Sequence, residues 1–541
     1  SGKLSIKYES AQLTGKAKKR LLTLSDMQSL KPFHWGYHFD KLITEKGGFD
    51  VIITNPPWEV FKPQAKEFFS QHSDLVTKNK MDIKTFEKEQ KKLLTNPEIA
   101  QAWLEYQSQY PHVSLYFRSS EQYKNQISIV NGKKQGTDIN LYKLFVEQCF
   151  NLLHPRGECG IVIPSGIYTD LGTKQLREML FSQTKVTGLF CFENRKTIFE
   201  GVDSRFKFVI LSFEKNKQTL SFPVEFMRHD VEELQRFPHK DSLVISVDLI
   251  RKLSPDSLSV MEFKQDIDIH IAEKMSRFPL LGETLPDTWN LKLTSEFHMT
   301  NDSHLFKTEP AQGRLPLYEG KMIEQFSHGL SQPRYWINES EGRKAILGKL
   351  PDNQQILDYQ TYRTGFRKIA SSTNARTLIA TIIPPAFHGE NFQSIVHFQE
   401  EVNRATNNKE CLLLVAIWNS FVLDYSLRHR VSANINFFYI YQLPIPRLKE
   451  EDKYFQEIVE NAAKLICTTE EFEQLAKEVG IGSHKNGVTE EAERMAIRAK
   501  LDAIVAHLYE LTLTEFQHIL TTFPLVPESV KTATLKAYQN L

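Results

Sequence analysis

The feature that most constrains the fold is an alternation of short β-rich runs with helical stretches, between residues 49 and 213. Buried strands of α/β proteins are near-continuous apolar runs, whereas helices space their apolar residues every three or four positions. This alternation is typical of a mainly parallel sheet flanked by helices, here half of a doubly wound α/β domain. The predicted strands are Phe49 to Thr54, Glu158 to Pro164, Val186 to Phe192 and Phe206 to Phe213, with helices at Leu141 to Leu153 and Gly172 to Phe181.

The composition narrows the class of protein further. Apolar residues make up 41% and charged residues 25%, as in ordinary globular proteins. The net charge of +1 excludes binding of a polyanion by global charge alone. The five cysteines form no CxxC pair, which favours a reducing cytoplasm, and no second ligand at zinc spacing accompanies any histidine, so no metal site is predicted. No apolar run approaches the roughly 18 residues of a membrane span, so no membrane partner is expected.

The tetrapeptide Asn55-Pro56-Pro57-Trp58 directly follows the first predicted strand, where active sites of open α/β sheets lie. Asn55 offers a side-chain carbonyl oxygen, and Pro56 offers a main-chain carbonyl on a backbone with fixed φ. Two such acceptors can take both hydrogens of an exocyclic amine and free its delocalised lone pair for reaction. Trp58 supplies a flat face on which a base swung out of a helix stacks. The alternative is a rigid turn after a strand.

Two runs without acidic residues lie in the second half of the chain. Because lysine and arginine contact phosphates and arginine can also read base edges, we expect a local DNA-binding surface in an otherwise neutral protein. For any single residue the alternative is a solvated loop face. The first run, Tyr359 to Gly389, carries Arg363, Arg367, Lys368 and Arg376, and the second, Tyr425 to Lys449, carries Arg428 and Arg430.

These segments resemble the adenine-specific, N6-amine DNA methyltransferases, especially the large type IIG restriction-modification enzymes and their phage-defence relatives. The resemblance covers nearly the whole chain. It rests on an ordered set of segments: KPFHW (Lys31 to Trp35), GGFDVIITNPPW, the segment Ile139 to Asp170, FENRKTIFEGVDSRFKFVILSF (Phe192 to Phe213), LPLYEGKMIEQFSHG, NSFVLDYSLRHRVSANINFFYIYQLPIP and RAKLDAIVAHLYELT.

The resemblance implies a reaction and a domain plan. Asn55 and Pro56 would hold the adenine amine, Trp58 would stack on the flipped base, and the methyl group would come from S-adenosylmethionine by direct displacement. Phe199 is the expected second aromatic residue, in competition with Phe206 and Phe208. Double-stranded DNA is the implied partner and a bacterial or archaeal cytoplasm the implied location. The expected parts are a partial catalytic domain (1–294) with a helical insertion (about 63–129), a mixed α/β target-recognition domain (295–449) and a helical C-terminal region (450–541).

One departure from the family concerns the cofactor. Members carry a glycine-containing loop of the DPACGSG kind before the catalytic motif, and no such loop precedes Asn55 in this chain, which begins SGKLSIKYES. We therefore expect the C-terminal portion of a longer enzyme, or a chain whose cofactor half comes from a partner, inactive in isolation. Two alternatives stay open: a non-catalytic DNA-specificity module working with a partner chain, and methylation of a protein amide.

Overall fold

The computed structural model describes residues 23–29, 31, 33–73, 76, 83–130, 133–134, 138–370, 374–398, 406–428, 430–431 and 434–541. The chain separates into two compact units, Ser1–Val260 and Met261–Leu541. The sequence places domain boundaries at residues 294 and 449 instead. The second unit joins the predicted target-recognition and C-terminal parts because both contribute to one hydrophobic core, which runs from Ile271 to Val526.

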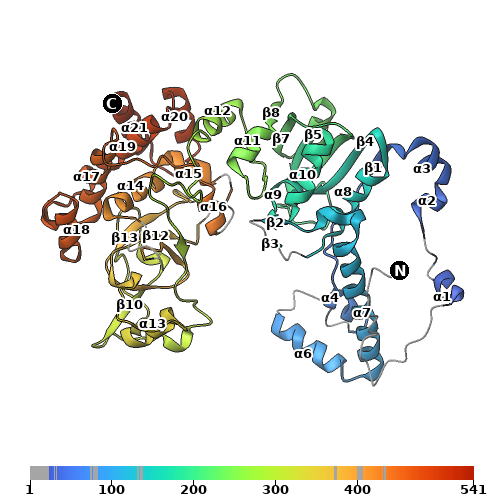
Figure 1. The fold of residues 1–541 in the computed structure, drawn as a ribbon, viewed down its shortest axis with the longest axis horizontal. Helices are drawn as coiled ribbons and strands as arrows, with labels where there is room; N and C mark the ends of the chain where they lie inside the picture. Colours follow the sequence, from blue (N-terminus) through green and yellow to red (C-terminus); the bar gives the residue numbers. More distant parts are fainter. Residues whose placement is uncertain are drawn as a thin grey trace. The chain divides into compact units, whose positions relative to one another are not determined.

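The first unit is an α/β domain (Figure 1). Its helices are α1 (Leu24–Ser29), α2 (Trp35–His38), α3 (Asp40–Lys46), α4 (Ala65–Ser70), α6 (Ile83–Leu93), α7 (Pro97–Ser119), α8 (Leu141–Leu152), α9 (Gly166–Thr169), α10 (Lys174–Gln183) and α11 (Val247–Leu253). Its strands are β1 (Phe49–Thr54), β2 (Ile129–Val130), β3 (Lys133–Lys134), β4 (Leu153–Pro164), β5 (Thr184–Glu193), β6 (Lys207–Lys215), β7 (Ser221–Arg228) and β8 (Leu243–Ser246).

Six of these strands form one mixed sheet in the order β1-β4-β6-β5-β7-β8. The pairs β1–β4 and β5–β7 are parallel, whereas β4–β6, β5–β6 and β7–β8 are antiparallel. The prediction of a mainly parallel sheet is therefore wrong. A parallel neighbour needs a long crossover, usually a helix, but β5 returns to β6 through a loop at residues 194–206 and so pairs with it in the opposite direction.

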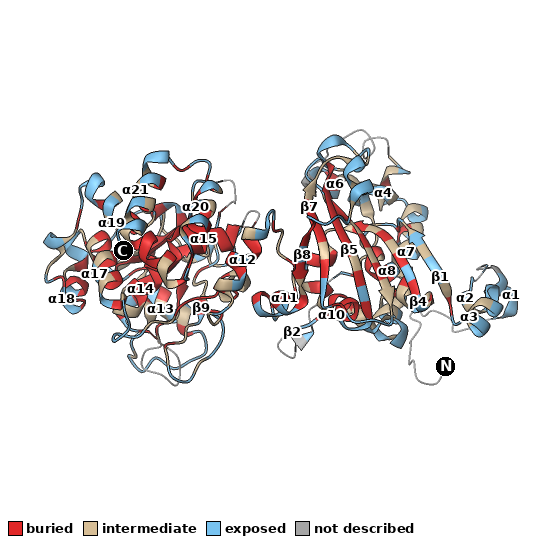
Figure 2. Cartoon of the chain, turned by 90° about the horizontal axis from the view of Figure 1, so that it is seen from above, coloured by how far each residue is buried: buried red, intermediate tan, exposed pale blue. Residues whose placement is uncertain are grey.

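Strand β1 lies at the edge of this sheet and is much more exposed than its neighbours. Ile53 is 84% exposed, whereas Ile161 of β4 and Val209 of β6 are fully buried. Figure 2 shows the difference as pale blue stretches on β1 against red stretches on β5 and β7. In the register of the sheet Thr54 lies beside Ile161, Pro164 beside Phe208, and Glu193 beside Lys207. The carboxyl ends of β1, β4 and β5 thus meet at one edge.

The region predicted as a helical insertion contains α4, α6 and α7. Phe69, Phe86 and Trp103, one from each helix, form a small hydrophobic core of their own. The long helix α7 starts where the side chain of Asn96 accepts a hydrogen bond from the N–H of Glu98, with proline at the first helical position. These helices gather on one side of the sheet domain, around α7 (Figure 1).

The second unit packs helices against two small sheets, in the orders β11-β10-β14 and β13-β12-β15-β9. Among the described residues no single helix is long and apolar enough to span a membrane; α14 and α15 reach that length and composition only as a pair bent by 63°. The elements are β9 (Leu293–Thr294), β10 (Arg314–Tyr318), β11 (Trp336–Asn338), β12 (Arg363–Arg367), β13 (Ala380–Ile383), β14 (Phe387–His388), β15 (Phe392–Ile395), α12 (Asp266–Met275), α13 (Glu339–Leu347), α14 (Asn408–Trp418), α15 (Phe421–Arg428), α16 (Phe437–Tyr441), α17 (Phe455–Ile466), α18 (Glu473–Glu478), α19 (Glu491–Leu508), α20 (Leu513–Thr521) and α21 (Glu528–Gln539).

Candidate active site

The tetrapeptide Asn55 to Trp58 forms the turn that leaves β1 at the shared carboxyl edge of the strands. Asn55 and Pro57 are exposed, Pro56 is buried and Trp58 is half-buried. The two prolines fix φ and have no N–H, so they add carbonyl acceptors to the turn and no donors. The result is a rigid segment with an exposed amide side chain at its start.

Contacts on both sides hold this turn in place. The indole N–H of Trp58 donates a hydrogen bond to the main-chain oxygen of Val162 in β4, at 3.2 Å. Two residues later, Val60 pairs in an antiparallel bridge with Asn140, just before α8. The N–H of Leu141 also donates to the oxygen of Glu59, at 2.9 Å. The turn is therefore fixed between β4 and the first residues of α8.

Three phenylalanines surround Trp58, and all come from the loop between β5 and β6 or from β6 itself. The ring centroids of Trp58 and Phe199 are 5.1 Å apart at 75°. Phe206 stacks on Trp58 at 5.7 Å and 12°, and Phe208 lies 5.9 Å away at 28°. Phe208 is only 2% exposed and belongs to the core, whereas Phe206 is 36% exposed and Phe199 is half-buried. The structure thus brings all the aromatic candidates of the sequence analysis together.

A charged cluster lies at the end of β5, beside the same loop. Arg195 and His229 both contact the carboxylate of Glu193, at 2.9 and 3.1 Å. Burial alone would raise the pKa of Glu193, but the hydrogen bonds from Arg195 and His229 outweigh it and lower this pKa. Glu193 is therefore an ionised partner of Arg195 that also hydrogen-bonds His229, and not a proton donor. The Asn55 turn itself contains no titratable side chain, because its residues are asparagine, two prolines and tryptophan.

Sequence reasoning did not single out Asn194, which follows Glu193. Its side chain is fully buried and hydrogen-bonds the main chain of Phe199 and Val202. The segment FENRKTIFEG contains this asparagine, but nothing in its letters indicates that the amide turns inward.

The structure assigns no residue to S-adenosylmethionine. The described residues before Asn55 form α1, α2, α3 and β1. Of the glycines there, Gly36 lies within α2, and Gly47 and Gly48 lie between α3 and β1. Since cofactor loops of the expected kind run from a strand into a helix, these positions carry no cofactor assignment.

The prediction of an exposed basic surface is wrong for Arg363. This arginine is fully buried and forms an ion pair with Glu296, at 2.9 Å. Its guanidinium also donates to Ser394 Oγ at 2.9 Å and to His388 Nε2 at 3.0 Å. Burial, and then the charge of Arg363, lower the pKa of His388 well below its ordinary value, so the imidazole is neutral and can accept.

Arg428 is buried and Arg376 keeps only 12% of its side chain exposed, for a similar reason. Both contact the carboxylate of Asp424, at 3.0 and 3.7 Å, and Asp424 has no exposed side-chain surface. The guanidinium of Arg376 also lies 3.9 Å from the ring centroid of Phe421. Asp424 precedes the second acid-free run by one residue, so a partner just outside the run neutralises arginines predicted to face DNA. The exposed-surface prediction is wrong for these two residues as well.

Arg430 faces the interior, where burial lowers its pKa to about 10, and it donates to the oxygen of Gln442 at 3.3 Å. Arg367 and Lys368 keep about a quarter of their side chains exposed, at 25% each. Arg367 donates to the oxygens of Gly320 and Ile323, and Lys368 pairs with Glu390 at 3.4 Å. Arg367 and Lys368 therefore keep more exposed side-chain surface than Arg363, Arg376 and Arg428, and their contact with DNA stays a prediction.

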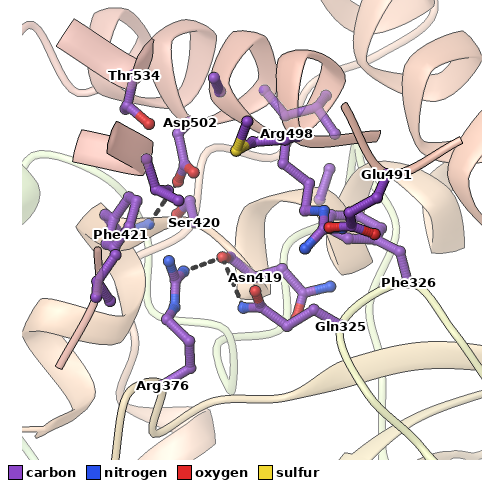
Figure 3. Close-up of a pocket in the computed structure, with 16 residues that line it drawn as sticks. Gln325, Phe326, Arg376, Asn419, Ser420, Phe421, Glu491, Arg498, Asp502 and Thr534 are labelled. Atoms are coloured by element: carbon purple, nitrogen blue, oxygen red, sulfur yellow. Dashed lines mark hydrogen bonds and ion pairs between the residues drawn. The ribbon is translucent and has the colours of Figure 1, made fainter. Parts of the chain in front are cut away.

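Arg376 also lines a cavity of about 190 Å³ in the second unit (Figure 3). Figure 3 shows its guanidinium reaching Asn419, whose oxygen it contacts, on the side opposite Asp502 and Thr534. Asp502 accepts the N–H of Phe421 at 2.7 Å, and burial raises the pKa of Asp502 to about 6. The hydroxyl of Thr534 is buried and hydrogen-bonds no described residue. This cavity is separate from the Asn55 turn, which lies in the first unit.

Solved structures of restriction-modification enzymes resemble the chain. The type IIL enzyme MmeI, solved in complex with DNA, is 12% identical with a TM-score of 0.43, and the match covers 94% of this chain and 60% of MmeI. The type IIG restriction endonuclease BpuSI is 13% identical with a TM-score of 0.27, over 70% of this chain and 50% of BpuSI.

Sequence comparison finds similarity in part of the chain. A Methanocaldococcus jannaschii protein named as a type II restriction enzyme and methyltransferase is 42% identical over 57 residues, which are 10% of this chain and 5% of that protein. The chain thus spans a small fraction of this relative and between half and two thirds of the two structures. The model of the Eco57I restriction-modification methylase family matches residues 4–100 and 113–199, which include the Asn55 turn and end at Phe199. The match covers 184 of the 541 residues, so this first part of the chain is similar to the Eco57I restriction-modification methylase family.

Proposed function

We propose that the chain carries the catalytic turn of a site-specific DNA methyltransferase that methylates the N6 amine of adenine, within a restriction-modification or phage-defence enzyme. The observation that carries the proposal is the exposed amide of Asn55 at the carboxyl edge of the sheet, beside an aromatic cluster of Trp58, Phe199 and Phe206. An acceptor next to partly exposed aromatic rings is the arrangement that an extrahelical base requires. Similarity of residues 4–100 and 113–199 to the Eco57I methylase family supports the reaction class.

The turn offers hydrogen-bond acceptors where an amine needs them. The side-chain oxygen of Asn55 and the main-chain oxygen of Pro56 would each accept one hydrogen of the adenine amine. The lone pair of that nitrogen then withdraws from the ring and becomes available to attack a methyl carbon. No protein nucleophile takes part in such a displacement.

The aromatic cluster would hold the base. Removing a base from the duplex costs a few kcal/mol, and stacking on aromatic side chains returns part of that energy. Trp58 and Phe199 contact each other nearly perpendicularly, at 75°, and Phe206, which stacks on Trp58, is 36% exposed. Because Val162 and the neighbouring phenylalanines fix Trp58, little side-chain entropy is lost when a base binds.

The methyl donor in this proposal is S-adenosylmethionine, whose sulfonium supplies an electrophilic methyl group. The residues that bind it are not assigned, and the proposal therefore concerns the acceptor side of the reaction. The expectation that the 541-residue chain alone is inactive stays part of the proposal.

Double-stranded DNA is the proposed substrate, and Arg367 and Lys368 are the proposed phosphate contacts in the second unit. Each neutralised phosphate releases counterions, so binding should weaken as salt rises. A Lys368→Ala change should reduce the salt dependence by about one phosphate contact and lower the affinity for all sequences alike. Binding that does not depend on salt would favour a protein substrate instead.

The test is methyl transfer from tritiated S-adenosylmethionine to unmodified plasmid DNA, followed by digestion to nucleosides. It uses the 541-residue chain and the product of its complete reading frame. We expect N6-methyladenine, and a loss of about 100- to 1,000-fold in the rate for Asn55→Ala, as when one donor of an oxyanion hole is removed. The exposed Asn301 provides the matched control, Asn301→Ala, which should keep the wild-type rate.

Two results would contradict the proposal. DNA binding without methylation by either form would identify a specificity module that acts with a partner chain. Methylation that survives Asn55→Ala unchanged would remove the turn from the reaction.

A further inference from the structure

The loop at residues 194–206 joins β5 to β6 and carries Phe199, the second aromatic residue of the proposed base pocket. We propose that Asn194 is a positioning residue that holds Phe199 against Trp58, so that the aromatic wall exists before DNA binds. The inference rests on the proposed function and deepens it. Asn194 acts through Phe199 and does not itself touch the base.

The buried amide of Asn194 makes three hydrogen bonds to the loop. Its Oδ1 accepts the N–H of Phe199 at 2.9 Å. Its Nδ2 donates to the main-chain oxygen of Phe199 at 2.9 Å and to that of Val202 at 3.0 Å. The side chain has no exposed surface. One residue therefore holds both main-chain polar groups of Phe199.

The rest of the loop gives Phe199 little other support. Residues 195–197, 200–201 and 203–205 are exposed. The main chain of Asn194 donates to the oxygen of Phe206, and Phe206 donates to the oxygen of Asp203, which closes the ends of the loop. Among the described residues, the main chain from Ile198 to Val202 is hydrogen-bonded only by Asn194. Without this amide the main chain between the loop ends would lose its hydrogen bonds, and only the packing of Ile198 and Phe199 against the aromatic core would hold it.

Asparagine suits this position because the amide provides an acceptor and two donor hydrogens on one short side chain. An aspartate would keep the acceptor for the N–H of Phe199 but would place negative charge against the oxygens of Phe199 and Val202. An alanine would leave all three main-chain groups without their partner. Buried hydrogen bonds of this kind each contribute a factor of about 2 to 10 to an equilibrium, so their joint loss should release the loop.

The central experiment is a double-mutant cycle on methyl transfer, with Asn194→Ala, Phe199→Ala and the double variant. If Asn194 acts only through Phe199, each single change should lower kcat by about 10- to 100-fold, and the double variant should lose no more than the larger single effect. The KM for plasmid DNA should stay within about twofold, because phosphate contacts set most of the affinity. The exposed Glu200 gives the matched control on the same loop, and Glu200→Ala should behave as wild type.

A second measurement does not depend on activity. Hydrogen exchange of the peptide that contains residues 195–206 should become faster in Asn194→Ala, whereas peptides from β5 and β6 should keep their protection. Asn194→Asp should also lower kcat and speed the exchange of this peptide, because it loses the two hydrogen bonds that Nδ2 donates and places negative charge against two carbonyl oxygens. If Asn194→Ala does not fold, Asn194→Asp carries the same comparison.

Wild-type kcat and unchanged exchange in Asn194→Ala would overturn the inference, and so would additive losses in the double variant. Those outcomes differ from failure of the proposed function. If Asn55→Ala loses methylation while Asn194→Ala keeps it, only the role of Asn194 fails; if wild type transfers no methyl group to DNA in any form, the proposed function fails, and the exchange measurement still decides whether Asn194 orders the loop.

Discussion

The sequence predicts that both the Asn55 turn of the first unit and the arginines of the second unit face a ligand. In the structure the two differ in how far they are exposed. Asn55 is exposed at the edge where strand ends meet, whereas Arg363 and Arg428 are buried and Arg376 is mostly buried, each beside a carboxylate. The position of a motif relative to a strand is a local property that the fold preserves. The absence of acids from a stretch of sequence is not, because partners come from elsewhere in the chain.

The distances along the sequence make this concrete. Arg363 pairs with Glu296, which lies 67 residues earlier. Arg376 pairs with Asp424, 48 residues later. A run without acids can therefore be fully paired in space, and a basic run predicts a surface only if its side chains point outward.

Replacement of Arg363 should have the largest effect on stability. Arg363→Met keeps the approximate volume but leaves the carboxylate of Glu296 buried without its cation, at an expected cost of about 3–5 kcal/mol in the free energy of unfolding. Urea unfolding measures this cost, with the exposed Arg334→Met as the control. A free energy of unfolding near that of wild type would contradict a structural role for the ion pair of Arg363 with Glu296.

The buried carboxyl of Asp502 should give a pH-dependent effect. Because burial raises its pKa to about 6 in the folded protein, the folded state binds a proton that the unfolded state has released. The ionisation of Asp502 therefore lowers the free energy of unfolding as pH rises from about 4 to about 6. Asp502→Asn should remove this loss and gain up to about 3 kcal/mol over wild type above pH 6. Equal pH profiles of the two proteins in urea unfolding would contradict the shift.

Trp58→Phe should separate the structural role of the indole from its aromatic surface. The change removes the hydrogen bond to Val162 and leaves that carbonyl without its donor, at about 1 kcal/mol of stability. The partly exposed Trp35→Phe is the control and should unfold as wild type does. If both variants unfold alike, the indole N–H does not anchor the turn.

Asn55→Ala should have the smallest effect on folding. The side chain is exposed, and surface substitutions usually stay within about 0.5 kcal/mol. A variant that loses methyl transfer but unfolds like wild type would set the Asn55 turn apart from the buried arginines. A loss of stability comparable with that of Arg363→Met would instead make Asn55 a structural residue.

The sequence predicts the elements of the first unit better than their arrangement. The apolar runs locate β1, β4, β5 and β6, and the helical spacing locates α8. An apolar run carries no information on strand direction, so the antiparallel pairing of β6 escaped prediction. Thr512 and Glu515, three residues apart, form a capping box at the start of α20; such a cap involves chain neighbours only, so its spacing is readable in the sequence.

In the candidate site, too, local sequence patterns predict some residues, whereas others depend on the arrangement of the chain in space. Asn55, Pro56, Pro57 and Trp58 are recognisable because their order follows a strand, and Phe199 is recognisable only by resemblance. The inward turn of Asn194 depends on where the loop main chain runs in space, which no local pattern encodes.

The two prolines after Asn55 have a consequence for selectivity. The two prolines have no main-chain N–H, so the main chain of the turn presents carbonyl oxygens and no donors at these positions to the bound base. Under the proposed function, a base with a keto oxygen where adenine has its amine would bring two lone-pair-bearing atoms into contact. The motif would therefore discriminate against guanine and thymine by electrostatic repulsion, without a need to measure their size.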